Sequence, residues 1–152
     1  MKRNIKFRGK SIESNEWVYG NLVVDSMTGN KMSIIDWADM SEDDKNGGAY
    51  VWNDIIHGTE SQFTELKDAN NKEIYEGDIL RKTDNMGMTG CAPRYKIFGN
   101  IKKVIFHEAS FRLTTSLASK KYHLASQYIR YYGFEIIGNI YEKPELLDTK
   151  KA

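Results

Sequence analysis

The apolar residues of this chain fall in short runs separated by polar turns, and this pattern predicts a mainly β protein. Within the runs, aromatic and β-branched residues alternate with polar ones, as expected for strands that bury one face. The runs end at turns rich in Gly, Asn and Asp, which are the residues that chain reversals favour. In chain order, the expected strands are Ile5–Phe7, Trp17–Val24, Met32–Asp36, Gln62–Asp68, a short strand within 72–76, Asp78–Leu80, Lys102–Phe106, Ser110–Thr114 and Phe134–Tyr141.

Two short helices and two loops complete the expected order. Ser116–Arg130 carries part of an apolar helical stripe, so a short helix is favoured there over an irregular segment. Pro144 suits the first turn of a terminal helix over Pro144–Leu147. The polar stretch Ser41–Gly48 is typical of a solvated loop, and Thr83–Pro93 is typical of a long flexible one.

The length of the chain predicts one domain over residues 1–152. A chain of 152 residues buries roughly two-thirds of its unfolded surface when it folds, so its core needs no cross-links. No internal repeat, low-complexity tract or linker divides the sequence. The single cysteine, Cys91, excludes an internal disulfide framework and a multi-cysteine zinc site, and it favours a reducing, intracellular setting.

The two ends of the sequence give no sign of targeting or membrane insertion. The basic segment Met1–Arg8 is followed by no apolar run, so it does not have the form of a signal peptide. No stretch approaches the roughly 20 apolar residues that a membrane-spanning helix needs. We therefore expect a soluble protein of the cytoplasm that does not bind membranes.

Charge is divided unevenly along the chain, although the net charge is only +1. Residues 1–10 contain five Lys or Arg and no acid, whereas residues 11–80 contain four bases and fifteen acids. Residues 81–130 are basic again, with ten bases and two acids. This division predicts a surface of two signs, whose halves neutralise each other within one domain or across an oligomer, or whose basic part meets nucleic acid.

Carboxylates cluster at one turn and define the strongest candidate for hydrolytic chemistry. Glu73, Glu76 and Asp78, together with a histidine, are the residue types that hold a metal ion or exchange protons in a metal-assisted hydrolase. A structural role explains the same residues: Gly77 is expected to take a positive φ, and Asp78 to accept backbone N–H groups in the turn. We favour the structural interpretation.

The remaining sequence features give no catalytic or cofactor motif. His57, His107 and His123 stand in no paired ligand motif, and Cys91 has no identifiable partner base. Glycine-rich phosphate loops are absent from the sequence. We therefore expect no enzyme activity, no metal and no cofactor.

Basic residues interleaved with aromatic residues over 94–130 predict a second kind of surface. Cations neutralise phosphates and aromatic rings stack on unpaired bases, so such a segment is suited to single-stranded nucleic acid. The alternative is that the aromatic residues pack into a core and the lysines protect sheet edges. The candidate nucleic-acid-binding residues are Lys102, Lys103, Arg112, Lys120 and Lys121.

Several blocks of the sequence together resemble the YopX family of small bacteriophage and prophage proteins. The family's blocks occur here in order and span nearly the whole chain. One departure is visible, because Glu65 stands where the family usually has glycine. The matching blocks are Lys6–Arg8, Trp17–Gly20, Gln62–Asp68, Lys72–Ile79, Ile137–Glu142 and Pro144–Leu147.

The resemblance implies a fold and a general role, but no catalytic residues. It implies a mainly β protein with a small, barrel-like (SH3-like) core, encoded by a phage or prophage and acting in the host bacterial cell. It also implies a non-enzymatic accessory protein that self-associates and has a host or phage protein as a further partner. The residues expected to serve the architecture are Ile74, Tyr75, Gly77, Asp78, Ile79, Ile137, Gly138, Asn139 and Ile140.

Overall fold

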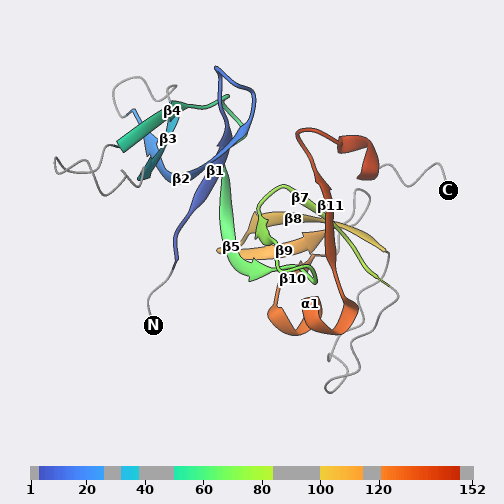
Figure 1. Ribbon diagram of the computed structural model, residues 1–152. Helices are drawn as coiled ribbons and strands as arrows, with labels where there is room; N and C mark the ends of the chain where they lie inside the picture. The colour runs from blue at the N-terminus through green and yellow to red at the C-terminus, as the bar shows by residue number, and fades with distance from the viewer. Residues whose placement is uncertain (1–3, 26–31, 38–49, 84–99, 115–120, 148–152) are drawn as a thin grey trace. The chain divides into compact units, whose positions relative to one another are not determined.

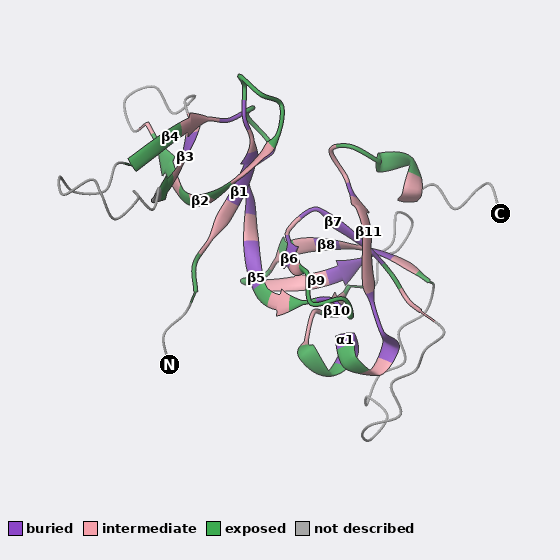
Figure 2. Cartoon of the chain, viewed as in Figure 1, coloured by how far each residue is buried: buried purple, intermediate pink, exposed green. Residues whose placement is uncertain are grey.

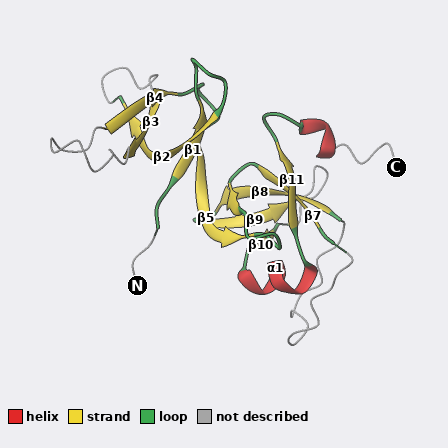
Figure 3. Ribbon diagram, viewed as in Figure 1, coloured by secondary structure: helices red, strands yellow, loops and turns green. Residues whose placement is uncertain are grey.

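A computed structural model describes residues 4–25, 32–37, 50–83, 100–114 and 121–147, and it is mainly β as the sequence predicts (Figures 1 and 3). The described residues do not include the polar stretch Ser41–Gly48, most of Thr83–Pro93, Cys91 or Lys120. The chain divides into two compact units, residues 1–63 and 64–152, and each is described by itself. The single domain expected over residues 1–152 stays a prediction.

The first unit is an antiparallel sheet in which the strands lie in the order β4-β3-β2-β1-β5. Val18 pairs with Gly9 across β2 and β1, and Ile35 pairs with Trp52 across β3 and β4. Ile34, Ile55 and Phe63 are its most deeply buried apolar residues. The strands are β1 (Phe7–Lys10), β2 (Trp17–Val24), β3 (Met32–Trp37), β4 (Tyr50–Asp54) and the first part of β5 (Ser61–Lys67).

The second unit contains a five-stranded antiparallel sheet with the order β10-β9-β8-β7-β11, while β6 lies beside β5. The expected strands Lys102–Phe106 and Ser110–Thr114, joined by a short connection that predicts a hairpin, do form one, with Val104 opposite Leu113. The elements are β6 (Glu73–Tyr75), β7 (Asp78–Arg81), β8 (Ile101–His107), β9 (Ser110–Thr114), β10 (Tyr122–His123), α1 (Ser126–Tyr132), β11 (Glu135–Asn139) and the 3₁₀ helix η1 (Pro144–Leu147).

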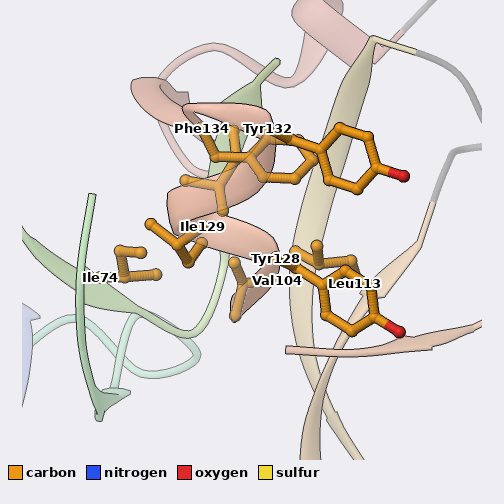
Figure 4. Close-up of a cluster of buried hydrophobic side chains, with 8 residues drawn as sticks. Ile74, Val104, Leu113, Tyr128, Ile129, Tyr132 and Phe134 are labelled. Carbon is orange, nitrogen blue, oxygen red and sulfur yellow. The ribbon is translucent and has the colours of Figure 1, made fainter. Parts of the chain in front are cut away.

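Helix α1 completes the hydrophobic core of the second unit (Figure 4). Tyr128, Ile129 and Tyr132 are buried because they occupy one face of the helix, where positions four residues apart lie one above the other. The rings of Tyr128 and Tyr132 are nearly parallel, with their centroids 6.4 Å apart. The helix ends at Gly133, which adopts the left-handed conformation typical of a helix C-terminus.

The structure differs from the expected fold in four places, and the first is that β1 (Phe7–Lys10) shares only Phe7 with the expected strand Ile5–Phe7. Strand β4 was not predicted, and only the last part of Ser116–Arg130 belongs to a helix, since Tyr122 and His123 pair with β9. Neither sheet of the described residues closes on itself, so the barrel-like core is not confirmed. A single antiparallel bridge, between Ser11 and Ile55, joins the ends of β1 and β4.

No helix in the described residues has the length and apolar character needed to cross a membrane.

The turn between β6 and β7 has the geometry that the sequence predicts. Gly77 adopts a φ of 80°, which places it in the left-handed region. Asp78 accepts the backbone N–H of Tyr75 through Oδ2, at 2.8 Å, and is 1% exposed. A Cβ at Gly77 would lie 3.0 Å from Cε2 of Tyr141. The turn therefore needs glycine for its backbone and also for its close packing.

Glu65 also adopts a left-handed conformation, with a φ of 64°. Glycine is usual at this position in the family that the sequence resembles. A residue with a Cβ pays roughly 1 kcal/mol or more in this region, whereas glycine enters it without a steric cost. Glu65 therefore holds this conformation at an energetic cost.

We expect the substitution Glu65→Gly to raise the free energy of unfolding by about 0.5–1 kcal/mol, because it removes this conformational strain. Urea denaturation followed by circular dichroism would measure the change. Lys67→Gly is a matched control, because Lys67 is exposed on the same strand and has no positive φ. It should destabilise the protein by a similar amount. Destabilisation by Glu65→Gly would contradict the prediction.

We expect Gly77→Ala to be more destabilising than Gly58→Ala. Both glycines have a positive φ, so both substitutions carry a backbone cost of about 1 kcal/mol. A Cβ at Gly58 has no heavy atom within 4 Å, whereas at Gly77 it would crowd the ring of Tyr141. Equal losses in urea denaturation would show that the packing around Gly77 adds nothing to the backbone cost.

Candidate functional site

The structure separates the candidate nucleic-acid-binding residues instead of gathering them into one exposed row. Lys102 is only 1% exposed, so it does not belong to an accessible basic surface. Lys102 shares its side of β8 with Val104, which is in the core, because alternate residues of a strand point to the same face. Its Nζ lies 5.4 Å from the centre of the Tyr122 ring, and burial lowers the pKa of Lys102 below its usual value of 10.5.

The other described members of this set differ in their surroundings. Lys103 and Arg112 lie on the opposite face of the hairpin from Lys102, since Arg112 is paired with Ile105 in the register. Arg112 forms an ion pair with Glu108, with 2.8 Å between Nη2 and Oε2. Lys121 is exposed just before β10. Within its described residues, the basic segment therefore offers fewer accessible cations than its composition suggests.

The acidic residues of the β6–β7 turn serve the architecture of the second unit. Glu73 accepts the hydroxyl of Tyr75 at 2.7 Å, and Asp78 accepts the backbone N–H of the same residue. Glu76 accepts the backbone N–H of Phe106 at 3.1 Å. Each carboxylate therefore holds a particular strand or turn, as the structural interpretation expected.

The three histidines are dispersed. His57 lies in the first unit, while His107 ends β8 and His123 ends β10 in the second. Within the ranges that the structure describes, no group of three or more His, Cys, Asp or Glu side chains could hold a metal ion. The metal-assisted hydrolase therefore has no assembled site in these ranges.

The residues expected to serve the architecture differ in their burial and hydrogen bonds. Asn139 accepts the backbone N–H groups of Tyr141 and Glu142 through Oδ1, each at 3.0 Å, and thereby shapes the turn after β11. Gly77 donates its N–H to Val104 and accepts that of Ile140. Ile74, Tyr75, Asp78, Ile79 and Asn139 are buried, whereas Ile137, Gly138 and Ile140 are half-buried.

Sequence reasoning missed Asp68, a buried carboxylate of the second unit that accepts three backbone N–H groups. Its Oδ1 accepts the backbone N–H groups of Asn70 and Lys72, at 2.8 and 2.9 Å. Its Oδ2 accepts that of Ile136, at 3.0 Å, so one side chain joins the turn after β5 to β11. The Asp-Ala-Asn-Asn turn was the available signal, since Asp caps such turns through its side chain.

Strand β4 presents a run of exposed apolar residues in the described part of the first unit, and Figure 2 shows the strand as exposed. Tyr50, Val51 and Trp52 are 63%, 44% and 62% exposed. Successive residues of a strand point to opposite faces, so β4 is uncovered on both faces over these three residues. The sequence held a signal for this strand, because three consecutive residues are of strongly β-forming types.

Strand β4 is also an edge strand in the described residues. One hydrogen bond next to it shows which of its residues bond to β3 and which direct their main-chain groups outward. The N–H of Ile55 donates to the carbonyl of Met32 in β3. In an antiparallel ladder the bonded positions alternate, so Val51 and Asn53 also bond to β3 while Trp52 directs its main-chain groups outward. The described chain places no hydrogen-bond partner on these groups of Trp52.

A hollow of about 430 Å³ opens beside β4 and has an acidic and aromatic lining. Trp52 and Asp54 share one face of β4, and the register places Ser33 opposite Asp54 and Val23 opposite Ser33. Ser33 donates its hydroxyl to Oδ1 of Asp54 at 2.6 Å. The described lining consists of Glu13, Val23, Asp25, Ser33, Trp52 and Asp54, which includes three carboxylates and no cation.

The same sheet face carries cations at its other side, on β1. The Arg8 guanidinium lies 4.5 Å from the centre of the Trp17 ring, and Nζ of Lys6 lies 5.5 Å from that of Tyr19. Lys10 also approaches Trp17, at 5.9 Å. These cations already cover aromatic rings of β2, so the face changes from basic on β1 to acidic beside β4.

Substitution of Lys102 by Met tests the placement of this residue in the core. Because burial lowers the pKa of Lys102, the unfolded chain binds the proton more tightly than the folded one, and stability rises with pH between the lowered pKa and 10.5. Lys102→Met lacks this rise, so its stability relative to the parent protein should fall as the pH rises toward 10.5. Denaturation at several pH values would measure it. Lys121→Met is the exposed control, and an equal pH trend in both variants would contradict the prediction.

Comparisons with known proteins place the chain in a family. A search of curated proteins found no match. Among solved structures, the crystal structure of protein EF1440 from Enterococcus faecalis is similar, with a TM-score of 0.60 and 21% sequence identity, over 96% of this chain and 99% of that one. At this identity the similarity shows the fold alone. The sequence matches the family described as YopX protein over residues 6–148. The chain therefore belongs to the YopX family.

Proposed function

We propose that this YopX protein is a non-enzymatic accessory protein of a phage or prophage, which acts in the host cytoplasm by binding other proteins. We further propose that it self-associates and that the outer edge of β4 is its contact surface. The observation that carries this proposal is the exposure of Tyr50, Val51 and Trp52 on an edge strand.

An edge strand with exposed apolar side chains is suited to protein binding for two physical reasons. Its outward main-chain groups can pair with another extended strand, and its side chains contribute apolar area when that strand covers them. Aromatic residues are enriched at the centres of protein interfaces because they bury much area with little loss of side-chain entropy. Tyr50 and Trp52 meet this description.

The division of charge supports self-association as well. The acidic hollow and the half-buried Lys6 and Lys10 both belong to the first unit, so two copies have side chains of opposite sign to present to each other. Such complementary surfaces steer association and fix the orientation of the subunits. Closed pairs with a twofold axis are the commonest outcome for a chain that binds itself.

Val51→Lys tests the contact surface, because a lysine on an edge strand opposes the addition of another strand. We expect sedimentation velocity to show a concentration-dependent mass for the parent protein and an association at least about tenfold weaker for the variant. Val51 is already 44% exposed, so the folded monomer should tolerate the charge.

Phe106→Lys is the matched control, because Phe106 is an exposed apolar residue of the second unit. It should leave the association unchanged. A parent protein that stays monomeric at every concentration would contradict self-association. If Phe106→Lys abolishes the association and Val51→Lys does not, β4 is not the contact surface.

A further inference from the structure

We propose that the β4 edge and the hollow beside it form one recognition site for an extended segment of a partner protein that carries an arginine. The segment adds to the sheet along β4, and its arginine side chain lies over Trp52 among the carboxylates of the hollow. This inference rests on the proposed function, because the partner segment would bind the same edge of β4 that a second copy contacts, and would compete with that copy for it.

The main chain of β4 provides the first half of the site. The outward N–H and carbonyl of Trp52 are placed to bond one residue of an added strand, as in any antiparallel or parallel pairing. The pairing has a limit at one end, because the carbonyl of Asp54 already accepts the N–H of Ile12, at 2.9 Å. An added strand is therefore centred on Trp52.

The register of the sheet provides the second half. A residue opposite Trp52 in an added strand has its side chain on the same face as Trp52, because paired residues of adjacent strands share a face. This face is the one that carries Trp52, Asp54, Ser33 and Val23, which line the hollow. The side chain opposite Trp52 therefore extends over the hollow.

The lining of the hollow selects a cation for that side chain. Glu13, Asp25 and Asp54 contribute three negative charges, and the indole of Trp52 offers an aromatic face that is 62% exposed. A cation over an indole is attracted by the ring, and carboxylates at the rim add further attraction. Arginine suits both, since its planar guanidinium stacks on a ring and bonds carboxylates in a bidentate manner.

The same lining disfavours nucleic acid. A phosphate brought to the hollow would be repelled by the three carboxylates of its lining. The volume of about 430 Å³ accommodates one long side chain but is open to solvent, so the interaction is expected to weaken as salt is added.

The experiment uses the full-length protein and a labelled pentapeptide, Thr-Val-Arg-Val-Thr, with blocked ends. Fluorescence anisotropy at low and high salt would measure its binding. We expect the arginine peptide to bind more tightly than the same peptide with lysine, and far more tightly than the one with citrulline, which has the shape of arginine without its charge. Trp52→Ala should weaken binding about tenfold, and Glu13→Gln or Asp25→Asn about threefold each.

Glu16→Gln is the matched control, because it removes one exposed carboxylate near Glu13 that does not line the hollow. It should leave binding unchanged. Citrulline and arginine peptides of equal affinity, or an equal loss with Glu16→Gln, would overturn the cation site. A single-stranded oligonucleotide that binds more tightly than the arginine peptide would overturn it as well.

A peptide methylated on the backbone nitrogens of its valine and arginine residues separates this inference from the proposed function. If methylation abolishes binding and the charge substitutions have no effect, the edge is the contact and the cation site is wrong. If methylation has no effect and the charge substitutions weaken binding, the proposed edge contact is wrong. If Glu13→Gln and Asp25→Asn weaken only the self-association measured by sedimentation, a second copy of the chain occupies the hollow, which overturns the assignment to a partner protein.

Discussion

In both units, the alternation of side chains along paired strands decides what each residue can do. A strand sends neighbouring residues to opposite faces, and its pairing with the next strand extends that choice across the sheet. In β8 this constraint places Lys102 with Val104 inside the second unit and leaves Lys103 on the other face. In β4 it brings Trp52 and Asp54 to one hollow and directs the main chain of Trp52 outward. The same alternation therefore buries Lys102, which was expected to bind nucleic acid, and exposes Trp52 at the edge of β4, which was not expected.

The sequence predicts the architecture of the second unit well, because there local signals and long-range packing agree. The turn at Gly77 and Asp78 and the β8–β9 hairpin follow from residue types at short spacing, and the structure confirms them. Helix α1 was harder to locate. Its buried Ile129 does not belong to the partial apolar stripe that Leu117, Leu124 and Tyr128 form in the sequence. Tyr122 and His123, which precede the helix, pair with β9 and form a strand.

The exposed edge of the first unit could not be read from the sequence for a different reason. The residue types of β4 indicate a strand, but only the pairing with β3 shows that this strand is an edge and that its apolar residues stay exposed. Likewise, Glu13, Asp25 and Asp54 are far apart in sequence and become one acidic lining only through the sheet. For Lys102 the sequence suggested an accessible binding residue, whereas the structure buries it. Counting the charges of a segment ignores the face to which each side chain points. Family membership indicates the fold but gives no residue roles. The residues of the hollow beside β4 are identified only by their positions in the sheet.

The hydrogen bond from Ile12 to Asp54 has a consequence for how far assembly can proceed. A bare apolar edge is the usual starting point for open-ended polymers, because each added strand exposes a fresh edge for the next. Here the chain's own Ile12 occupies the edge at Asp54, and β4 is only five residues long. Strand addition at β4 therefore has little room to propagate into fibrils, even though the apolar side chains of this strand are exposed.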